Sequence, residues 1–222
     1  MALNVSLQSS GAGGQYLNFI KYNASAGRMF RRDKENGEVR EVDITRNFKA
    51  VMDLENVESG YGLFAPGAAP DLRVTHWSKP APANPGKPFK PAARVVMKLS
   101  KECGGDIREM SGNAQTYMQG IEKLHNDWLA QSKDNPGKLP VVVLRDTIGV
   151  TTGESGMKKT NFIPDFEIVG WVKRPDDLVY KPHSSAAPVE SDDEEPAPAR
   201  TPPSTGSTKA KAPVMADEED FG

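Results

Sequence analysis

Basic and aromatic residues alternate at positions 28, 30 and 32 of the chain, where Arg28, Phe30 and Arg32 occupy every second position. Successive side chains of a β-strand point to opposite faces, so these three side chains would share one face of a strand. Cations neutralise phosphate groups, and aromatic rings stack on bases with little regard for their sequence. This spacing therefore predicts a surface that binds single-stranded nucleic acid.

The same combination of residue types recurs in short segments elsewhere in the chain. Two of these segments open and close a Pro-rich stretch, 78–93, and another precedes the last β-rich run. The complete set of predicted nucleic-acid-binding residues is Lys21, Tyr22, Arg28, Phe30, Arg32, Trp77, Lys79, Lys87, Phe89, Lys90, Lys158 and Lys159.

Aromatic residues in strands are more often part of a core than of a binding surface. On this ground we expect five of them to be buried, namely Phe19, Phe48, Phe162, Phe166 and Trp171. Phe30 differs because both of its same-face neighbours are arginines, and Trp77 and Phe89 differ because they lie beside prolines and lysines. These three are the predicted stacking residues.

Residue patterns typical of catalysis or metal binding are not found in the sequence. The three histidines, His76, His125 and His183, are scattered, and the chain contains no His-x-x-x-His or Cys-x-x-Cys pair. His125 is expected to be a satisfied core or boundary residue beside Trp128. Ser155 is followed directly by glycine, so it does not form a Gly-x-Ser-x-Gly nucleophile elbow.

A magnesium-dependent nuclease remains an alternative, because Asp146, Asp165 and Glu167 could gather around a cation. These acids lack a lysine at a fixed spacing, however. We therefore expect no enzymatic activity, no catalytic residues, no metal and no cofactor.

Short β-rich runs dominate the first 180 residues. Asn36-Gly37 between two alternating runs predicts a β-hairpin, and further runs are expected near 16–22, 48–54, 61–64, 72–77, 94–100, 140–151 and 162–172. Residues 113–132 differ, since Tyr117, Ile121, Leu124 and Trp128 recur at helical spacing. Ser111 or Asn113 could cap the start of this helix.

This order of elements predicts a mainly β fold, namely an OB-fold-like Greek-key barrel with one inserted helix. An SH3-like barrel and an irregular sandwich remain alternatives. Residues 1–180 would form one nucleic-acid-binding domain with extra strands and the Pro-rich loop 78–93. The single cysteine, Cys103, cannot form an internal disulfide, and no apolar run is long enough to cross a membrane. No signal peptide is recognisable, so we expect a cytoplasmic protein.

Residues 181–222 differ in composition and charge from the body. They contain 4 Lys and Arg against 9 Asp and Glu, whereas the whole chain contains 28 and 30. Their few bulky apolar residues predict a disordered acidic tail on a mildly basic body. The tail nevertheless ends in four acids and an aromatic residue, Asp217, Glu218, Glu219, Asp220 and Phe221, followed by Gly222.

With its barrel-like body, polar tail and acidic-aromatic tip, the chain resembles the single-stranded DNA-binding proteins of bacteria and, more closely, of phages. The resemblance implies that residues 217–221 recruit replication or recombination proteins and compete with DNA for the body's groove. Many members of that family end on the apolar residue itself, whereas here Gly222 follows Phe221.

We therefore expect a sequence-tolerant single-stranded DNA-binding protein that could form a homo-oligomer and has no membrane association. In a phage it would work in the host cytoplasm. The main alternative is a phage structural or assembly protein whose tail confers solubility.

Overall fold

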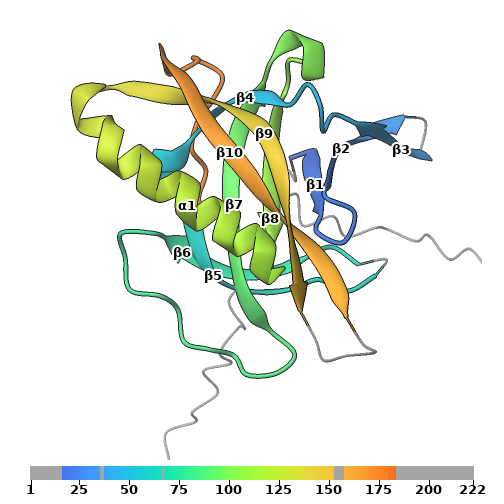
Figure 1. Cartoon of the computed structure of the whole chain (residues 1–222). Coiled ribbons are helices and arrows are strands. Elements are labelled where there is room, and N and C mark those ends of the chain that lie inside the picture. Colours follow the sequence, from blue (N-terminus) through green and yellow to red (C-terminus); the bar gives the residue numbers. More distant parts are fainter. Residues whose placement is uncertain (1–16, 36–37, 67, 153–157, 184–222) are drawn as a thin grey trace, which may run out of the picture. The chain divides into compact units, whose positions relative to one another are not determined.

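A computed structural model describes residues 17–35, 38–66, 68–152 and 158–183. Within these ranges the chain forms ten strands and one α-helix (Figure 1). The strands are β1 (Phe19–Asn23), β2 (Arg28–Glu35), β3 (Glu38–Asp43), β4 (Lys49–Met52), β5 (Glu58–Leu63), β6 (Asp71–His76), β7 (Lys90–Leu99), β8 (Ile107–Gly112), β9 (Lys138–Thr152) and β10 (Lys159–Lys173). The helix is α1 (Gln115–Gln131), and 3-10 turns cover Leu54–Asn56, Lys101–Cys103 and Ser132–Asp134.

The mainly β architecture with one inserted helix confirms the predicted fold class. The strands pair in the order β10-β9-β4-β7-β8-β1-β2-β3, with β5 joining β7 and β6 beside this path. All the pairs are antiparallel except β1–β8, which is parallel, so the sheet is mixed. Among the described residues no pairing joins β3 to β10, so the barrel-like sheet is not closed.

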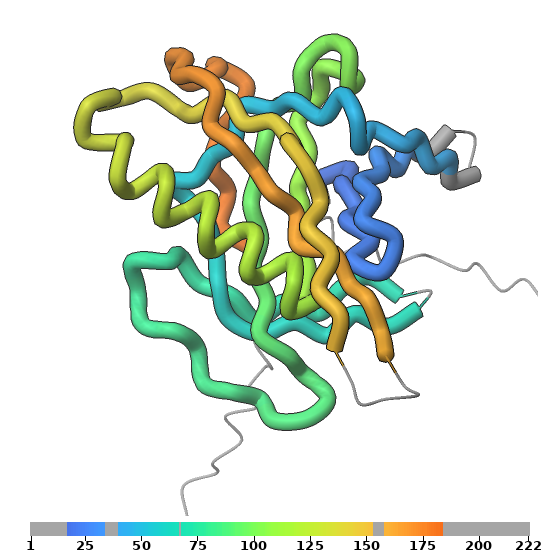
Figure 2. The backbone as a smooth tube through the Cα atoms, viewed as in Figure 1, coloured from blue at the N-terminus to red at the C-terminus, as the bar shows by residue number. Residues whose placement is uncertain are grey.

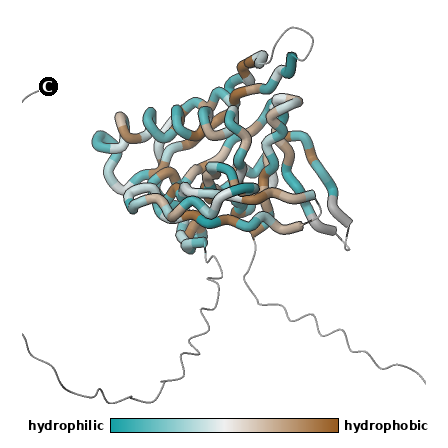
Figure 3. Tube along the Cα trace, turned by 90° about the horizontal axis from the view of Figure 1, so that it is seen from below, coloured by the Kyte–Doolittle hydropathy of each residue, from teal (hydrophilic) through white to brown (hydrophobic). Residues whose placement is uncertain are grey.

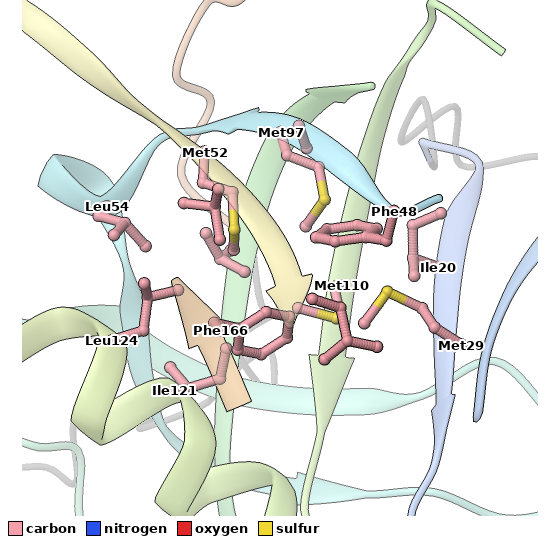
Figure 4. Packing of buried hydrophobic residues seen from close by; sticks show 14 of the residues in the cluster. Ile20, Met29, Phe48, Met52, Leu54, Met97, Met110, Ile121, Leu124 and Phe166 are labelled. Atoms are coloured by element: carbon pink, nitrogen blue, oxygen red, sulfur yellow. The ribbon is translucent and has the colours of Figure 1, made fainter. Parts of the chain in front are cut away.

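The core lies between α1 and the inner face of the sheet (Figure 4). All four residues of the predicted helical stripe, Tyr117, Ile121, Leu124 and Trp128, are buried. Gly120 allows close packing, because a Cβ there would lie 2.5 Å from a ring carbon of Pro164 in β10. The helical periodicity therefore predicted correctly which face of α1 is buried.

The strands contribute to the same core by alternation, as the mixture of hydrophobic and hydrophilic positions along the chain illustrates (Figure 3). In β7, Val95, Met97 and Leu99 face the core. Val96, between them, belongs instead to a second cluster with Leu139 and Leu178. This second cluster lies on the outer face, because neighbouring positions in a strand point to opposite sides.

Residues 174–183, which we call the C-terminal strap, supply Leu178 to that outer cluster. Arg174 donates to both carboxylate oxygens of buried Asp53, at 2.7 and 2.8 Å. The Tyr180 hydroxyl and the His183 amide donate to Glu58 at 3.1 and 2.9 Å. The folded chain therefore continues through His183, beyond the expected boundary at residue 180.

The single cysteine and the helix both bear on the class of protein. Cys103 is fully buried, and its thiol donates to the Asn47 carbonyl at 3.0 Å, which is typical of a structural cysteine. Among the described residues, no helix has the length and apolar character needed to span a membrane.

Candidate nucleic-acid interface

The structure places Arg28, Phe30 and Arg32 on one face of β2, as predicted. Met29, which lies between the first two, is completely buried on the opposite face. Lys21 of β1 lies directly opposite Phe30 in the strand register. These residues form one charged surface on β1, β2 and β3, which we call the β1–β3 face.

The three cations of the β1–β3 face whose side chains the structure describes, Lys21, Arg28 and Arg32, each have an acidic partner on β3. Lys21 and Arg32 both contact Glu41, at 3.3 and 3.1 Å. Arg28 contacts Asp43 at 2.7 Å. A phosphate would have to compete with these carboxylates, so the face is less available to a polyanion than its cations alone indicate.

Phe19 also lies on the β1–β3 face, with 40% of its surface exposed, so its expected burial is wrong. Its neighbour Ile20 enters the core instead. The guanidinium carbon of Arg32 lies 5.0 Å from the centroid of the Phe19 ring, within the range of a cation–π contact. The expected burial is confirmed for Phe48 and Phe166. Phe162 and Trp171 are partly buried.

Tyr22, which follows Lys21 in β1, is partly buried in the protein. It packs against the core, and its hydroxyl donates to the Phe162 carbonyl at 2.9 Å. Burial raises the pKa of this phenol above its usual value. These contacts favour a structural role for Tyr22, in contrast to the exposed Lys21 beside it.

Trp77 is partly exposed but held against α1. Its indole nitrogen donates to the Glu55 carbonyl at 2.8 Å. Its ring meets His125 and Trp128 edge-on, with centroid distances of 4.8 and 6.1 Å. His125 lies beside Trp128, as expected, although its buried Nε2 has no hydrogen-bond partner among the described residues.

The Pro-rich connection between β6 and β7 forms a long excursion beside the sheet (Figure 2). Lys79 and Lys87 are exposed along it. The Phe89 ring lies 5.0 Å from the guanidinium carbon of Arg73. Lys90 belongs to β7, where it pairs with Gly62, so the loop ends before the predicted residue 93.

Lys90 and Lys159 both line a groove of about 730 Å³ beside the first turn of α1. We call it the α1 groove; β7, α1, β9, β10 and the β1–β2 turn contribute to it. Figure 1 shows the first turn of α1 close to the ends of β9 and β10. Its polar lining includes Lys90, Asn113, Gln115, Gln119, Lys159 and Asn161.

No Asp or Glu is found among the described residues that line the α1 groove. Lys90 and Lys159 are exposed, and neither forms an ion pair with a described residue. Lys158, also exposed, precedes Lys159 in the chain. The groove therefore combines uncompensated positive charge with amide groups that can donate hydrogen bonds.

Four amide residues of the groove were not predicted to belong to a site, namely Asn113, Gln115, Gln119 and Asn161. Uncharged amides are common on protein surfaces and have no distinctive spacing here. One available signal was the beginning of the predicted helix, where an anion would be favoured and no acidic residue is present.

Two of the acids considered for a magnesium site form ion pairs with basic side chains. The Asp165 carboxylate is 3.4 Å from the Lys123 ammonium, and Glu167 is 4.0 Å from Arg145. In the described part of the chain no group of three or more His, Cys, Asp or Glu side chains could hold a metal ion. The predicted partner-binding tip, residues 217–221, lies outside the described residues.

Comparison of the chain with family models, with curated proteins and with solved structures finds no match. The case for a function therefore depends on the residues and geometry described above.

Proposed function

We propose that this chain is a sequence-tolerant single-stranded DNA-binding protein, and that the strand passes through the α1 groove. The observation that carries the proposal is that Lys90 and Lys159 line one groove in which none of the described lining residues is acidic. A polyanion gains most where cations have no competing carboxylates, because it then displaces only counterions.

The groove favours a single strand over a duplex. Its lining is concave and comes from the ends of β-strands, a turn and the end of a helix. A single DNA strand, which is flexible, can follow such a surface closely. Apolar side chains such as Met118, Val150 and Pro91 lie between the polar ones and offer contact area to bases. Contacts to phosphates, combined with apolar contacts to bases, are typical of sequence-tolerant single-strand binding.

From the groove, the bound DNA would continue onto the β1–β3 face. Ala24, in the turn between β1 and β2, lines the α1 groove, and β2 leads from this turn to Arg28 and Phe30. Phe30 and Phe19 offer rings for stacking. The cations of this face add less affinity than Lys90 and Lys159, since Glu41 and Asp43 already neutralise them.

The acidic tip would then recruit replication or recombination proteins. Residues Asp217–Asp220 supply charge that steers the chain to a basic surface, and Phe221 supplies one apolar anchor. This part of the proposal depends on the sequence alone.

The test compares three single lysine substitutions in the full chain by fluorescence anisotropy with an oligo-dT strand. Lys90→Ala and Lys159→Ala should each weaken binding severalfold and lower the salt slope by about 0.7, the value for one lost single-strand phosphate contact. Lys133→Ala is the matched control, because this exposed lysine lies beyond the opposite end of α1. Equal losses for all three variants would show attraction by net charge alone and would contradict the assigned groove.

A further inference from the structure

The first turn of α1 opens onto the α1 groove without a side-chain cap. Ala114 occupies the N-cap position with extended backbone angles, φ −68° and ψ 133°, and forms no side-chain capping hydrogen bond. Neither predicted capping residue replaces it, and the Asn113 side chain donates to the Gly62 carbonyl at 3.2 Å instead. Alanine is among the poorest N-cap residues, so the first N–H groups of the helix are left for another acceptor.

A buried hydroxyl at the same place also lacks a partner. Thr116, in this first turn, is only 9% exposed and lines the α1 groove. Its Oγ1 has no hydrogen-bond partner among the described residues. Buried polar groups without partners are costly, and one whose residue lines a groove can gain a hydrogen bond from a ligand bound there.

The charges around this turn favour an anion. The helix dipole places partial positive charge at its N-terminus, and no acidic residue in the first turn offsets it. Lys90 from β7 and Lys159 from β10 line the same groove, and its described lining residues include no carboxylate. Backbone N–H groups, a hydroxyl and two ammonium groups are together the usual donors to a phosphate.

We infer that the N-terminus of α1 is a phosphate-binding site that holds one backbone phosphate of the bound strand. The first-turn N–H groups and the Thr116 hydroxyl donate to its oxygens, and Lys90 and Lys159 neutralise its charge. This inference rests on the proposed function and deepens it, because it fixes one point of the bound DNA relative to the fold.

The decisive variant is Ala114→Asp, which should stabilise the fold but weaken DNA binding. An aspartate at the N-cap accepts the first-turn N–H groups and should raise the melting temperature by about 2–4 °C. The same carboxylate occupies the phosphate position and repels the strand. Affinity for oligo-dT should therefore fall by at least about tenfold, and the salt slope should decrease by about 0.7.

Asn126→Asp is the matched control. It introduces the same charge at an exposed position of α1, about 18 Å along the helix axis from residue 114. Its effect on affinity should be less than about twofold, because salt screens that distance at physiological ionic strength. An Ala114→Asp protein that binds oligo-dT as tightly as the Asn126→Asp protein would overturn the inference.

A second measurement locates the phosphate directly. In amide NMR spectra of the full chain, oligo-dT should shift the first-turn amides of Gln115, Thr116 and Tyr117 more than those at the end of α1. A response of these amides to inorganic phosphate but not to the oligonucleotide would overturn the assignment to a strand backbone. A wild-type chain that binds no oligo-dT contradicts the proposed function itself, whereas binding with unshifted first-turn amides contradicts only the phosphate site.

Discussion

Lys90 and Lys159 line the same groove although they begin strands, β7 and β10, that are not neighbours in the sheet. The helix α1 completes the groove between them, so a cation from each side faces the uncapped helix end. The location of positive charge thus depends on how the sheet curves and not on any one segment of sequence.

Phe30 should contribute to binding without contributing much to stability. Its side chain lies on the outer face of β2, opposite buried Met29, so Phe30→Ala removes a stacking ring and leaves the core intact. We expect affinity for oligo-dT to weaken by about 1–3 kcal/mol, measured by anisotropy, with a melting temperature close to that of the wild type.

Trp77→Ala is the contrasting variant. Its ring packs against His125 and Trp128, so its loss should destabilise the fold by about 2 kcal/mol in urea titrations. The folded fraction should bind normally. A Phe30→Ala protein that is destabilised and binds as the wild type would show that Phe30 has the structural role instead.

The buried ion pair between Glu58 and Arg94 should be important for stability. Glu58 is 2% exposed and accepts hydrogen bonds from Arg94, from the Tyr180 hydroxyl and from the His183 amide. Glu58→Gln leaves part of the Arg94 charge unpaired in the interior and should lower the free energy of unfolding by about 3 kcal/mol. Glu41→Gln, at an exposed ion pair, should cost less than about 1 kcal/mol. Comparable urea midpoints for the two variants would count against this account of the strap.

His125 should make stability depend on pH. Burial lowers its pKa below the usual value of 6.5, aided by the nearby His76. The fold therefore favours the neutral ring, and below about pH 6.5 the unfolded chain binds more protons than the folded chain. The free energy of unfolding should fall as the pH drops from about 6.5 through the folded-state pKa.

Urea titrations between pH 7.5 and 5 test this dependence. The His125→Gln protein should lose less stability over the interval than the wild type, because a glutamine does not titrate. Parallel curves for the two proteins would assign the pH dependence to other groups.

Removal of residues 184–222 should tighten binding. These residues carry 3 Lys and Arg against 9 Asp and Glu, so their loss makes the remaining chain more positive. We expect the gain in oligo-dT affinity to be greatest at low salt, where screening is weakest. Phe221→Ala in the full chain should leave DNA affinity unchanged but weaken any partner interaction that depends on the tail. Identical affinity with and without residues 184–222 at low salt would contradict competition by the acidic tail.

Local sequence patterns predicted much of the fold. The spacing of Tyr117, Ile121, Leu124 and Trp128 correctly gave the buried face of α1, and alternation in β2 gave the shared face of Arg28, Phe30 and Arg32. Both patterns depend only on the geometry of one element.

The missed features depend on pairing between distant segments. Residues Ile107–Gly112 contain few β-formers, yet they become β8 because β7 and β1 offer backbone partners on both sides. Phe19 is exposed because the pairing of β1 with β8 turns Ile20 inward. Propensity and composition do not encode such register.

The same limit applied to the candidate site. Lys90 and Lys159 were each predicted from their local sequence, but their common groove was not. Conversely, Glu41 and Asp43 come close to the cations of the β1–β3 face only because β3 pairs with β2. The sequence alone did not identify them as acidic partners.

The most direct test of the central claim is the affinity of the full chain for oligo-dT and for a duplex of equal length, measured by anisotropy over a range of salt concentrations. We predict tighter binding to the single strand, with the logarithm of affinity falling by about 0.7 per phosphate contact for each log unit of salt. Equal affinity for duplex and single strand, or an affinity for oligo-dT that does not change with salt, would contradict it.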